Sequence, residues 1–150
     1  MRIVVGADHA GFELKQHLAA ALRDAGHEVL DVGTHSAEST DYPRFAEPAA
    51  RMVAAGEAER GVLVCGSGVG VSIVANKVDG ARAVNAHDVD EASTARRHND
   101  VNVLTLSGRR LAAPEADAIV EAFLATGFEG GRHQRRVELI GEVERRDAAD

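Results

Sequence analysis

Short runs of aliphatic residues alternate along the chain with longer segments whose apolar residues recur every three or four positions. The short runs predict five strands, at residues 2–7, 28–32, 62–64, 81–84 and 101–106. The longer segments predict helices at residues 12–25 and 45–53, in a run that ends near 77, and at 88–98, 114–124 and 133–146. Pro48 falls inside the second of these, so that helix either starts late or kinks. Regular alternation of strand and helix is typical of a parallel sheet with helices on both faces.

The same alternation predicts where a ligand binds. In such sheets the ligand lies beyond the carboxyl ends of the strands, where the strand order reverses. We therefore expect the turns after the first, third, fourth and fifth strands to converge on one crevice. The helix at 133–146 follows three glycines and carries a narrow apolar stripe, so we expect it to pack on a partner subunit.

Composition narrows the class of protein further. A chain of 150 residues with 3% aromatic residues predicts a single domain, residues 1–150, with a core of small aliphatic side chains. The one cysteine excludes an intrachain disulfide and fits the reducing cytoplasm. The sequence offers neither a signal peptide nor an apolar run of membrane-spanning length, so no membrane partner is expected. The net charge of -7 argues against nucleic acid and still allows a phosphorylated metabolite.

Residues 61–77 carry the most informative pattern in the chain. A buried strand ends in the lone Cys65, and Gly66, Gly68 and Gly70 follow at alternate positions before a helix. Glycines let the backbone approach a ligand closely, and the free N–H groups of a helix start favour an anion or a thiolate. This stretch alone supports two interpretations: an anion site beside a reactive Cys65, or a tight turn with Cys65 as a small core residue.

Other candidate residues are each open to a structural explanation. Asp8 and His9 follow the first strand, where catalytic or phosphate-binding groups belong, although Asp8 also suits a helix cap. His98 precedes the fifth strand, and capping of helix carbonyls is the simpler interpretation of it. Arg132 and Arg136 share one face of a helix start, where they oppose the helix dipole, so they suit either a phosphate or a solvated surface.

Nucleotide and metal chemistry are not indicated. Arg109, after the fifth strand, offers the same choice between phosphate and solvent as the other arginines. No glycine turn has the dinucleotide or ATP fingerprint, which disfavours both ligands. Asp8, His9 and His98 do not have the spacing of a known metal site, so no metal is expected.

Six motifs occur in a fixed order: Gly-Ala-Asp-His-Ala-Gly at 6–11, Asp-Tyr-Pro at 41–43, Cys-Gly-Ser-Gly-Val-Gly at 65–70, Ala-Asn-Lys at 75–77, His-Asn-Asp at 98–100 and Gly-Gly-Arg-His-Gln-x-Arg at 130–136. With these motifs the chain resembles the ribose/galactose-phosphate isomerase family from about residue 3 to residue 145. The resemblance implies a three-layer α/β/α sandwich, Rossmann-like, with a five-stranded parallel sheet. It also implies homodimers with shared active sites, sometimes paired into tetramers.

The resemblance implies an aldose–ketose isomerase of the non-oxidative pentose phosphate pathway. Such an enzyme interconverts D-ribose 5-phosphate and D-ribulose 5-phosphate through a cis-enediolate, without metal or cofactor. Cys65 matches the base, His98 the group that opens the sugar ring, and Ser67 the hydroxyl beside the enediolate oxygen. The matching substrate-binding residues are Asp8, His9, Tyr42, Gly66, Gly68, Val69, Gly70, Asn99, Arg109, Arg132 and Arg136. Some of the phosphate contacts would come from the partner chain.

Two alternatives remain open at this point. The same chemistry suits another sugar phosphate, such as allose 6-phosphate, galactose 6-phosphate or a tetrulose phosphate. A non-catalytic sugar-phosphate-binding module is the alternative of another class, and the presence of Asp8, Cys65, His98 and Arg132 weighs against it. Val71 stands where one branch of the family has a glutamate, so the resemblance is to the branch that uses cysteine.

Overall fold

The computed structural model describes residues 1–149 and contains one sheet built from the predicted strands. Its strands are β1 (Arg2–Ala7), β2 (Glu28–Asp31), β3 (Arg60–Cys65), β4 (Ala83–Asn85) and β5 (Val103–Ser107). They pair in the order β2-β1-β3-β5-β4, and every neighbouring pair is parallel. The predicted five-stranded parallel sheet is therefore confirmed.

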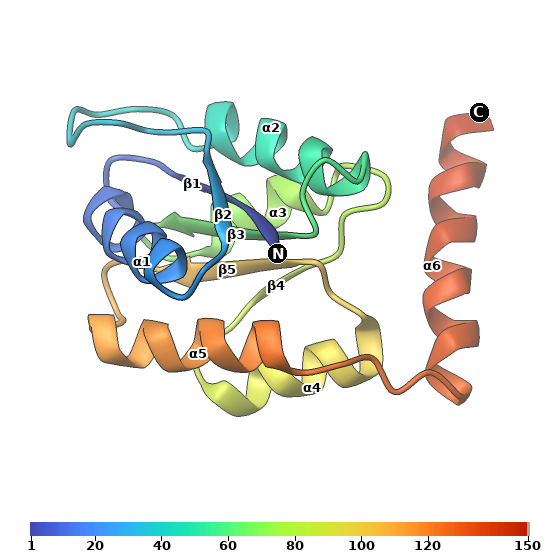
Figure 1. Ribbon diagram of the computed structural model, residues 1–150. Helices are drawn as coiled ribbons and strands as arrows, with labels where there is room; N and C mark the ends of the chain where they lie inside the picture. The colour runs from blue at the N-terminus through green and yellow to red at the C-terminus, as the bar shows by residue number, and fades with distance from the viewer. Residues whose placement is uncertain (150) are drawn as a thin grey trace.

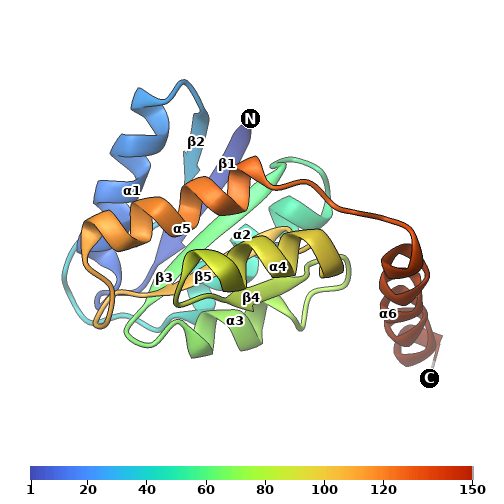
Figure 2. The same cartoon turned by 90° about the horizontal axis from the view of Figure 1, so that it is seen from below.

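Helices cover both faces of this sheet, as Figures 1 and 2 show. One face packs against α1 (Phe12–Asp24), α4 (Val89–Asn99) and α5 (Ala113–Ala125). The opposite face packs against α2 (Pro43–Ala54) and α3 (Val69–Ala75). The arrangement confirms the three-layer α/β/α sandwich.

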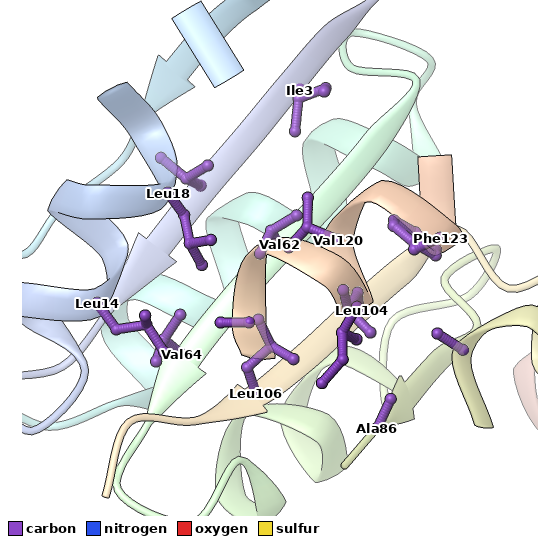
Figure 3. Packing of buried hydrophobic residues seen from close by; sticks show 14 of the residues in the cluster. Ile3, Leu14, Leu18, Val62, Val64, Ala86, Leu104, Leu106, Val120 and Phe123 are labelled. Atoms are coloured by element: carbon purple, nitrogen blue, oxygen red, sulfur yellow. The ribbon is translucent and has the colours of Figure 1, made fainter. Parts of the chain in front are cut away.

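The core is divided by the sheet into two apolar clusters, because successive side chains of a strand point to opposite faces. On one face Val62 and Val64 of β3 pack with Leu18 of α1 and Phe123 of α5, as Figure 3 shows. On the other face Leu63 of β3 packs among the alanines and valines of α2 and α3. Burial on both faces explains why the strands have continuous apolar runs rather than alternation.

Two helices extend beyond their predicted bounds by two or more residues at one end. The second helix begins at Pro43, a favourable first position for proline, and runs unbroken through Pro48 to Ala54. The alternative in which it starts late is therefore wrong. The last helix, α6 (Arg132–Ala149), is longer than the predicted 133–146.

Helix α6 stands apart from the three layers. Figure 1 shows it upright beside the sheet, joined to α5 by an extended connection. It touches the rest of the chain chiefly at α4. Leu139, Ile140 and Val143 on α6 are each at least 40% exposed, which is unusual for three large apolar side chains of one helix.

Candidate active site

The strand order reverses between β1 and β3, and a cavity of about 370 Å³ lies beyond their carboxyl ends. Helix α1, which follows β1, and helix α3, which follows β3, lie on opposite faces and leave this crevice between them. The cavity is lined by Asp8, His9, Ala10, Tyr42, Cys65, Gly66, Ser67, Val69, Gly70, Ile73 and Arg109. The turns after β1, β3 and β5 therefore converge as predicted.

The turn after β4 was expected in the same crevice, but it does not line the cavity. It contacts the cysteine–glycine loop instead. Asn85, the last residue of β4, donates its side-chain amide to the Ser67 carbonyl at 3.3 Å. Its side-chain oxygen occupies the space that a Cβ on Gly68 would need. Gly68 also has a φ of +78°, so its backbone and its surroundings both require glycine.

Buried hydroxyl groups on β5 orient the cysteine–glycine loop. Ser107 Oγ donates to the Gly66 carbonyl at 2.6 Å, and Thr105 Oγ1 donates to the Gly68 carbonyl at 2.9 Å. In a trans peptide the following N–H points opposite to the carbonyl, so the Ser67 N–H points away from β5. Sequence reasoning missed Thr105 and Ser107, although polar residues at alternate positions of a buried strand are a visible signal.

Cys65 combines a buried position with access to the cavity. Its side chain is 4% exposed and belongs to the core on the α2–α3 face. The Gly68 N–H donates to Cys65 Sγ at 3.2 Å, and the sulfur lies just before the start of α3. An amide donor and a helix start are typical surroundings of a cysteine that acts as a base or nucleophile. Cys65 is therefore a core residue that also lines the cavity, and its reactivity stays a prediction.

Asp8 and His9 enter the cavity from the turn after β1. Asp8 Oδ1 accepts the Gly11 N–H at 3.0 Å, so the predicted capping role is also present, at the turn that leads into α1. The Thr40 N–H donates to His9 Nδ1 at 3.1 Å. A neutral His9 ring in this arrangement carries its proton on Nε2, where it can donate to a ligand.

The loop that holds His9 is anchored by a buried ion pair. Lys15 is fully buried, and its Nζ donates to Asp31 at 2.7 Å and to the Thr34 carbonyl at 2.7 Å. This clamp fixes the start of the loop between β2 and α2. The same loop carries Thr40 to its contact with His9.

Tyr42 and Arg109 close the cavity from opposite sides of the loop. The Tyr42 ring lies against Gly70, where an added Cβ would come within 2.6 Å of the ring carbon that bears the hydroxyl. The Arg109 guanidinium lies over Gly66, where an added Cβ would be 3.0 Å from its central carbon. The loop glycines therefore make room for an aromatic ring and a cation beside Cys65.

The remaining predicted residues lie at the opposite end of the sheet, where the strands begin. His98 and Asn99 end α4, and the following Asp100 adopts φ +48° to turn the chain into β5. Buried Arg96 fixes this turn, donating to Asp100 at 2.9 Å and to the Val101 carbonyl at 2.6 Å. This turn precedes β5, so it lies where the strands begin.

Helix α6 begins at the same edge. Arg132 and Arg136 are exposed on its first turns. The His133 ring stacks on the His98 ring, with ring centres 4.3 Å apart and planes 10° apart. Capping of helix carbonyls, the simpler interpretation of His98, does not describe this stacked ring. Sequence reasoning also missed His133. This residue lies in the motif at 130–136, but no role was predicted for it.

One chain therefore holds the predicted site residues in two separate groups. β3 runs six residues from Arg60 to Cys65, so its ends are about 16 Å apart. Around Cys65 lie Asp8, His9, Tyr42, Gly66, Ser67, Gly68, Val69, Gly70 and Arg109. His98, Asn99, Arg132 and Arg136 do not reach this cavity within the same chain.

Three potential metal ligands cluster at the junction of α4 and α6. Ligand atoms of His98, Glu129 and His133 lie within 4.8 Å of one another. The two imidazoles are stacked, however, and the lone pairs of stacked rings lie in parallel planes that do not converge on one ion.

Separately, no helix within the described residues has the length and apolar character needed to cross a membrane.

The fold and the cysteine pocket define a Rossmann-like α/β protein with a crevice at its switch point. The sequence pattern of the family described as Ribose/Galactose Isomerase matches residues 3–140. This chain belongs to that family, which makes it an isomerase and confirms the family resemblance of its motifs.

Individual relatives agree over almost the whole chain. Ribose-5-phosphate isomerase B of Escherichia coli K12 is 48% identical over 145 residues, which cover 97% of each chain. The solved ribose-5-phosphate isomerase B of Clostridium thermocellum superposes with a TM-score of 0.96 at 45% identity, covering 97% of this chain and 99% of that one. The enzyme from Mycoplasma genitalium, solved with bound ribulose-5-phosphate, gives a TM-score of 0.93 at 39% identity and 96% coverage of both chains.

Proposed function

We propose that this protein interconverts D-ribose 5-phosphate and D-ribulose 5-phosphate. The observation that carries the proposal is the Cys65 pocket, with an amide donor at the sulfur and His9 and Arg109 in the same cavity. The relatives named ribose-5-phosphate isomerase B support the choice of a pentose phosphate, and one of them was solved with ribulose-5-phosphate. The sequence comparisons thus favour the pentose over the hexose and tetrulose phosphates.

The chemistry proceeds on the open-chain sugar. Cys65 Sγ takes the proton from C2 of the aldose, and the C2–H electron pair moves into a C1–C2 double bond while the carbonyl oxygen becomes anionic. Ser67 and the backbone N–H groups of the loop stabilise this enediolate oxygen. The proton then returns from sulfur to C1, while the proton of the C2 hydroxyl passes to the anionic C1 oxygen, so that C2 becomes the ketone and C1 carries the hydroxyl. Atoms and charge balance without a further reactant.

Binding of the phosphate positions the reacting carbons. His9 Nε2 and the Arg109 guanidinium supply hydrogen-bond donors at the pocket. Arg132 and Arg136 of another chain complete the set of phosphate contacts. They are four residues apart on α6. Energy from this remote contact lowers the barrier by holding C1 and C2 near the base.

We further propose a homodimer in which each active site is shared. The Cys65 pocket lies at the carboxyl edge of the sheet, whereas His98, Asn99, Arg132 and Arg136 lie at the amino edge. A two-fold arrangement brings the amino edge of one chain to the pocket of its partner and completes both sites at once. The exposed Leu139, Ile140 and Val143 of α6 supply apolar surface for that contact. The single cysteine supports a cytoplasmic location.

The deciding experiment measures ketose formation from ribose 5-phosphate, allose 6-phosphate and a tetrose phosphate, each with and without excess chelator. Chelator-insensitive turnover of the pentose is expected. Turnover of another sugar alone would retain the mechanism and change the substrate. Cys65→Ala should abolish turnover and leave ribose 5-phosphate binding measurable by calorimetry. A Cys65→Ala variant with undiminished turnover would remove Cys65 from the role of base.

A further inference from the structure

His133 is a buried histidine for which the mechanism above has no use. It is 6% exposed, although Arg132 and Gln134 on either side are exposed. Gly130 and Gly131 precede it with φ values of +68° and +55°, and the His133 N–H donates to the Gly130 carbonyl at 3.0 Å. This glycine turn places the first residues of α6 against the end of α4.

The His133 ring contributes a flat surface rather than a hydrogen bond. Its Nε2 is buried without a hydrogen-bond partner, and the Glu129 carboxylate lies 3.6 Å away. Burial lowers the pKa of His133 below its ordinary 6.5, and the neighbouring His98, Arg132 and Arg136 lower it further, against the opposing effect of Glu129. The ring is therefore neutral at neutral pH.

A neutral ring at this position restricts His98. The half-buried His98 imidazole lies 4.3 Å from His133 and nearly parallel to it. A terminal χ2 torsion of histidine is otherwise broad, so an unstacked His98 ring would sample many orientations. Stacking on His133 selects one of these orientations.

We propose that His133 is a positioning residue that holds the His98 imidazole in the orientation needed to open the sugar ring. The inference rests on the proposed function, in which His98 moves a proton between the ring oxygen and the C1 hydroxyl of ribose 5-phosphate. His133 touches neither the sugar nor the reacting atoms in this role. A displacement of about 1 Å at such a group costs about 100-fold in rate.

The test compares two reactions that differ only in their need for ring opening. Ribose 5-phosphate is a closed ring in solution, whereas ribulose 5-phosphate is an open chain. In heavy water the thiol of Cys65 exchanges its proton for deuterium, so enolisation and its reversal introduce deuterium at C1 of ribulose 5-phosphate. Proton NMR of ribulose 5-phosphate thus reports enolisation, and ketose formation from ribose 5-phosphate reports ring opening and enolisation together.

His133→Leu removes the aromatic surface, and His133→Phe retains it. We expect His133→Leu to lower kcat/KM for ribose 5-phosphate by about 10- to 100-fold while deuterium exchange stays close to the wild-type rate. His133→Phe should restore turnover of ribose 5-phosphate. His27→Leu is the matched control, because His27 lies just before β2 and far from α6. This variant should change neither rate.

Three results would overturn the inference. His133→Leu with both rates lowered equally would show that His133 only docks α6, and a variant with neither rate lowered would show that His98 needs no support. Circular dichroism and sedimentation show whether His133→Leu is folded. If it is not, the two rates of His133→Phe are compared with those of the wild type instead. A wild-type protein inactive in both reactions would overturn the proposed function itself, and the role of His133 with it.

Discussion

At the scale of single residues, the site depends on side chains that never contact the cavity. Ser107 and Thr105 are at most 1% exposed, yet their hydroxyls set the direction of the peptides that follow Cys65. Lys15 likewise acts at a distance, through the loop that carries Thr40 to His9. The residues that bind substrate are therefore only part of what the sequence must specify.

Removal of a loop anchor should cost activity as well as stability. Ser107→Ala removes one hydrogen bond to Gly66, which should lower the free energy of unfolding by about 1 kcal/mol. It should also lower kcat/KM for ribose 5-phosphate, because only the Arg109 N–H, at 3.2 Å, would then hold the Gly66 carbonyl. Urea unfolding and steady-state kinetics measure the two effects.

Thr105 provides an internal comparison for this prediction. Thr105→Val should reproduce the loss, and Thr105→Ser, which keeps the hydroxyl, should restore it. Thr94→Val replaces an exposed threonine on α4 and serves as the control. Stability lowered in Ser107→Ala with unchanged kcat/KM would mean that the loop holds its orientation without β5.

At the scale of elements, the sequence predicted most of what the structure contains. Buried parallel strands leave a strong signal, since their apolar runs are short and are followed by helical periodicity. Helix ends were predicted less well: α2 starts at Pro43, two residues before Phe45, and the exposed Pro43 and Arg44 add nothing to the apolar periodicity. The turn after β4 was wrongly placed in the crevice, because strand order, and hence which strand lies at the edge, depends on contacts distant in sequence.

The junction of α4 and α6 gives a prediction on pH. The pKa of His133 is lowered in the folded protein, so below pH 6.5 the unfolded chain binds more protons at this residue than the folded chain does. The stability that the neutral His133 ring contributes is therefore constant above pH 6.5. It is lost as the pH falls from 6.5 through the folded-state pKa. His133→Phe has no such group, so its stability should fall less on acidification.

Urea unfolding at about pH 7.5 and about pH 5.5 tests this prediction. The difference in unfolding free energy between the two pH values should be larger for the wild type than for His133→Phe. Other titrating groups are common to both proteins and cancel in the comparison. Equal differences would show that His133 is not held neutral by its surroundings.

At the scale of the whole molecule, the arrangement of the candidate site was only partly accessible to sequence. The resemblance gave every residue a role, but it did not indicate that Cys65 and His98 lie at opposite ends of the parallel strands in one chain. That separation follows from helix direction: α4 ends where β5 begins, while β3 ends at Cys65. A shared site in a homodimer remains a prediction that rests on this separation.

Subunit complementation tests the shared site directly. Cys65→Ala and His98→Asn should each be inactive with ribose 5-phosphate. If each site takes Cys65 from one chain and His98 from its partner, a mixed dimer has one site with both residues intact and one with neither. Random reassociation of equal amounts should then recover about a quarter of the wild-type activity. Mixtures that stay inactive, although mass spectrometry detects mixed dimers, would show that each chain works alone.

The division of the predicted site residues between the two ends of the strands also bears on how much protein a cell must hold. If the sites are shared as proposed, a lone chain carries no complete site, and catalysis begins only when two chains meet. Below the dissociation constant of the pair, activity per volume would rise with the square of the amount of protein. Dilution would then inactivate the enzyme without unfolding it, and a cell that made half as much protein would lose more than half of its flux.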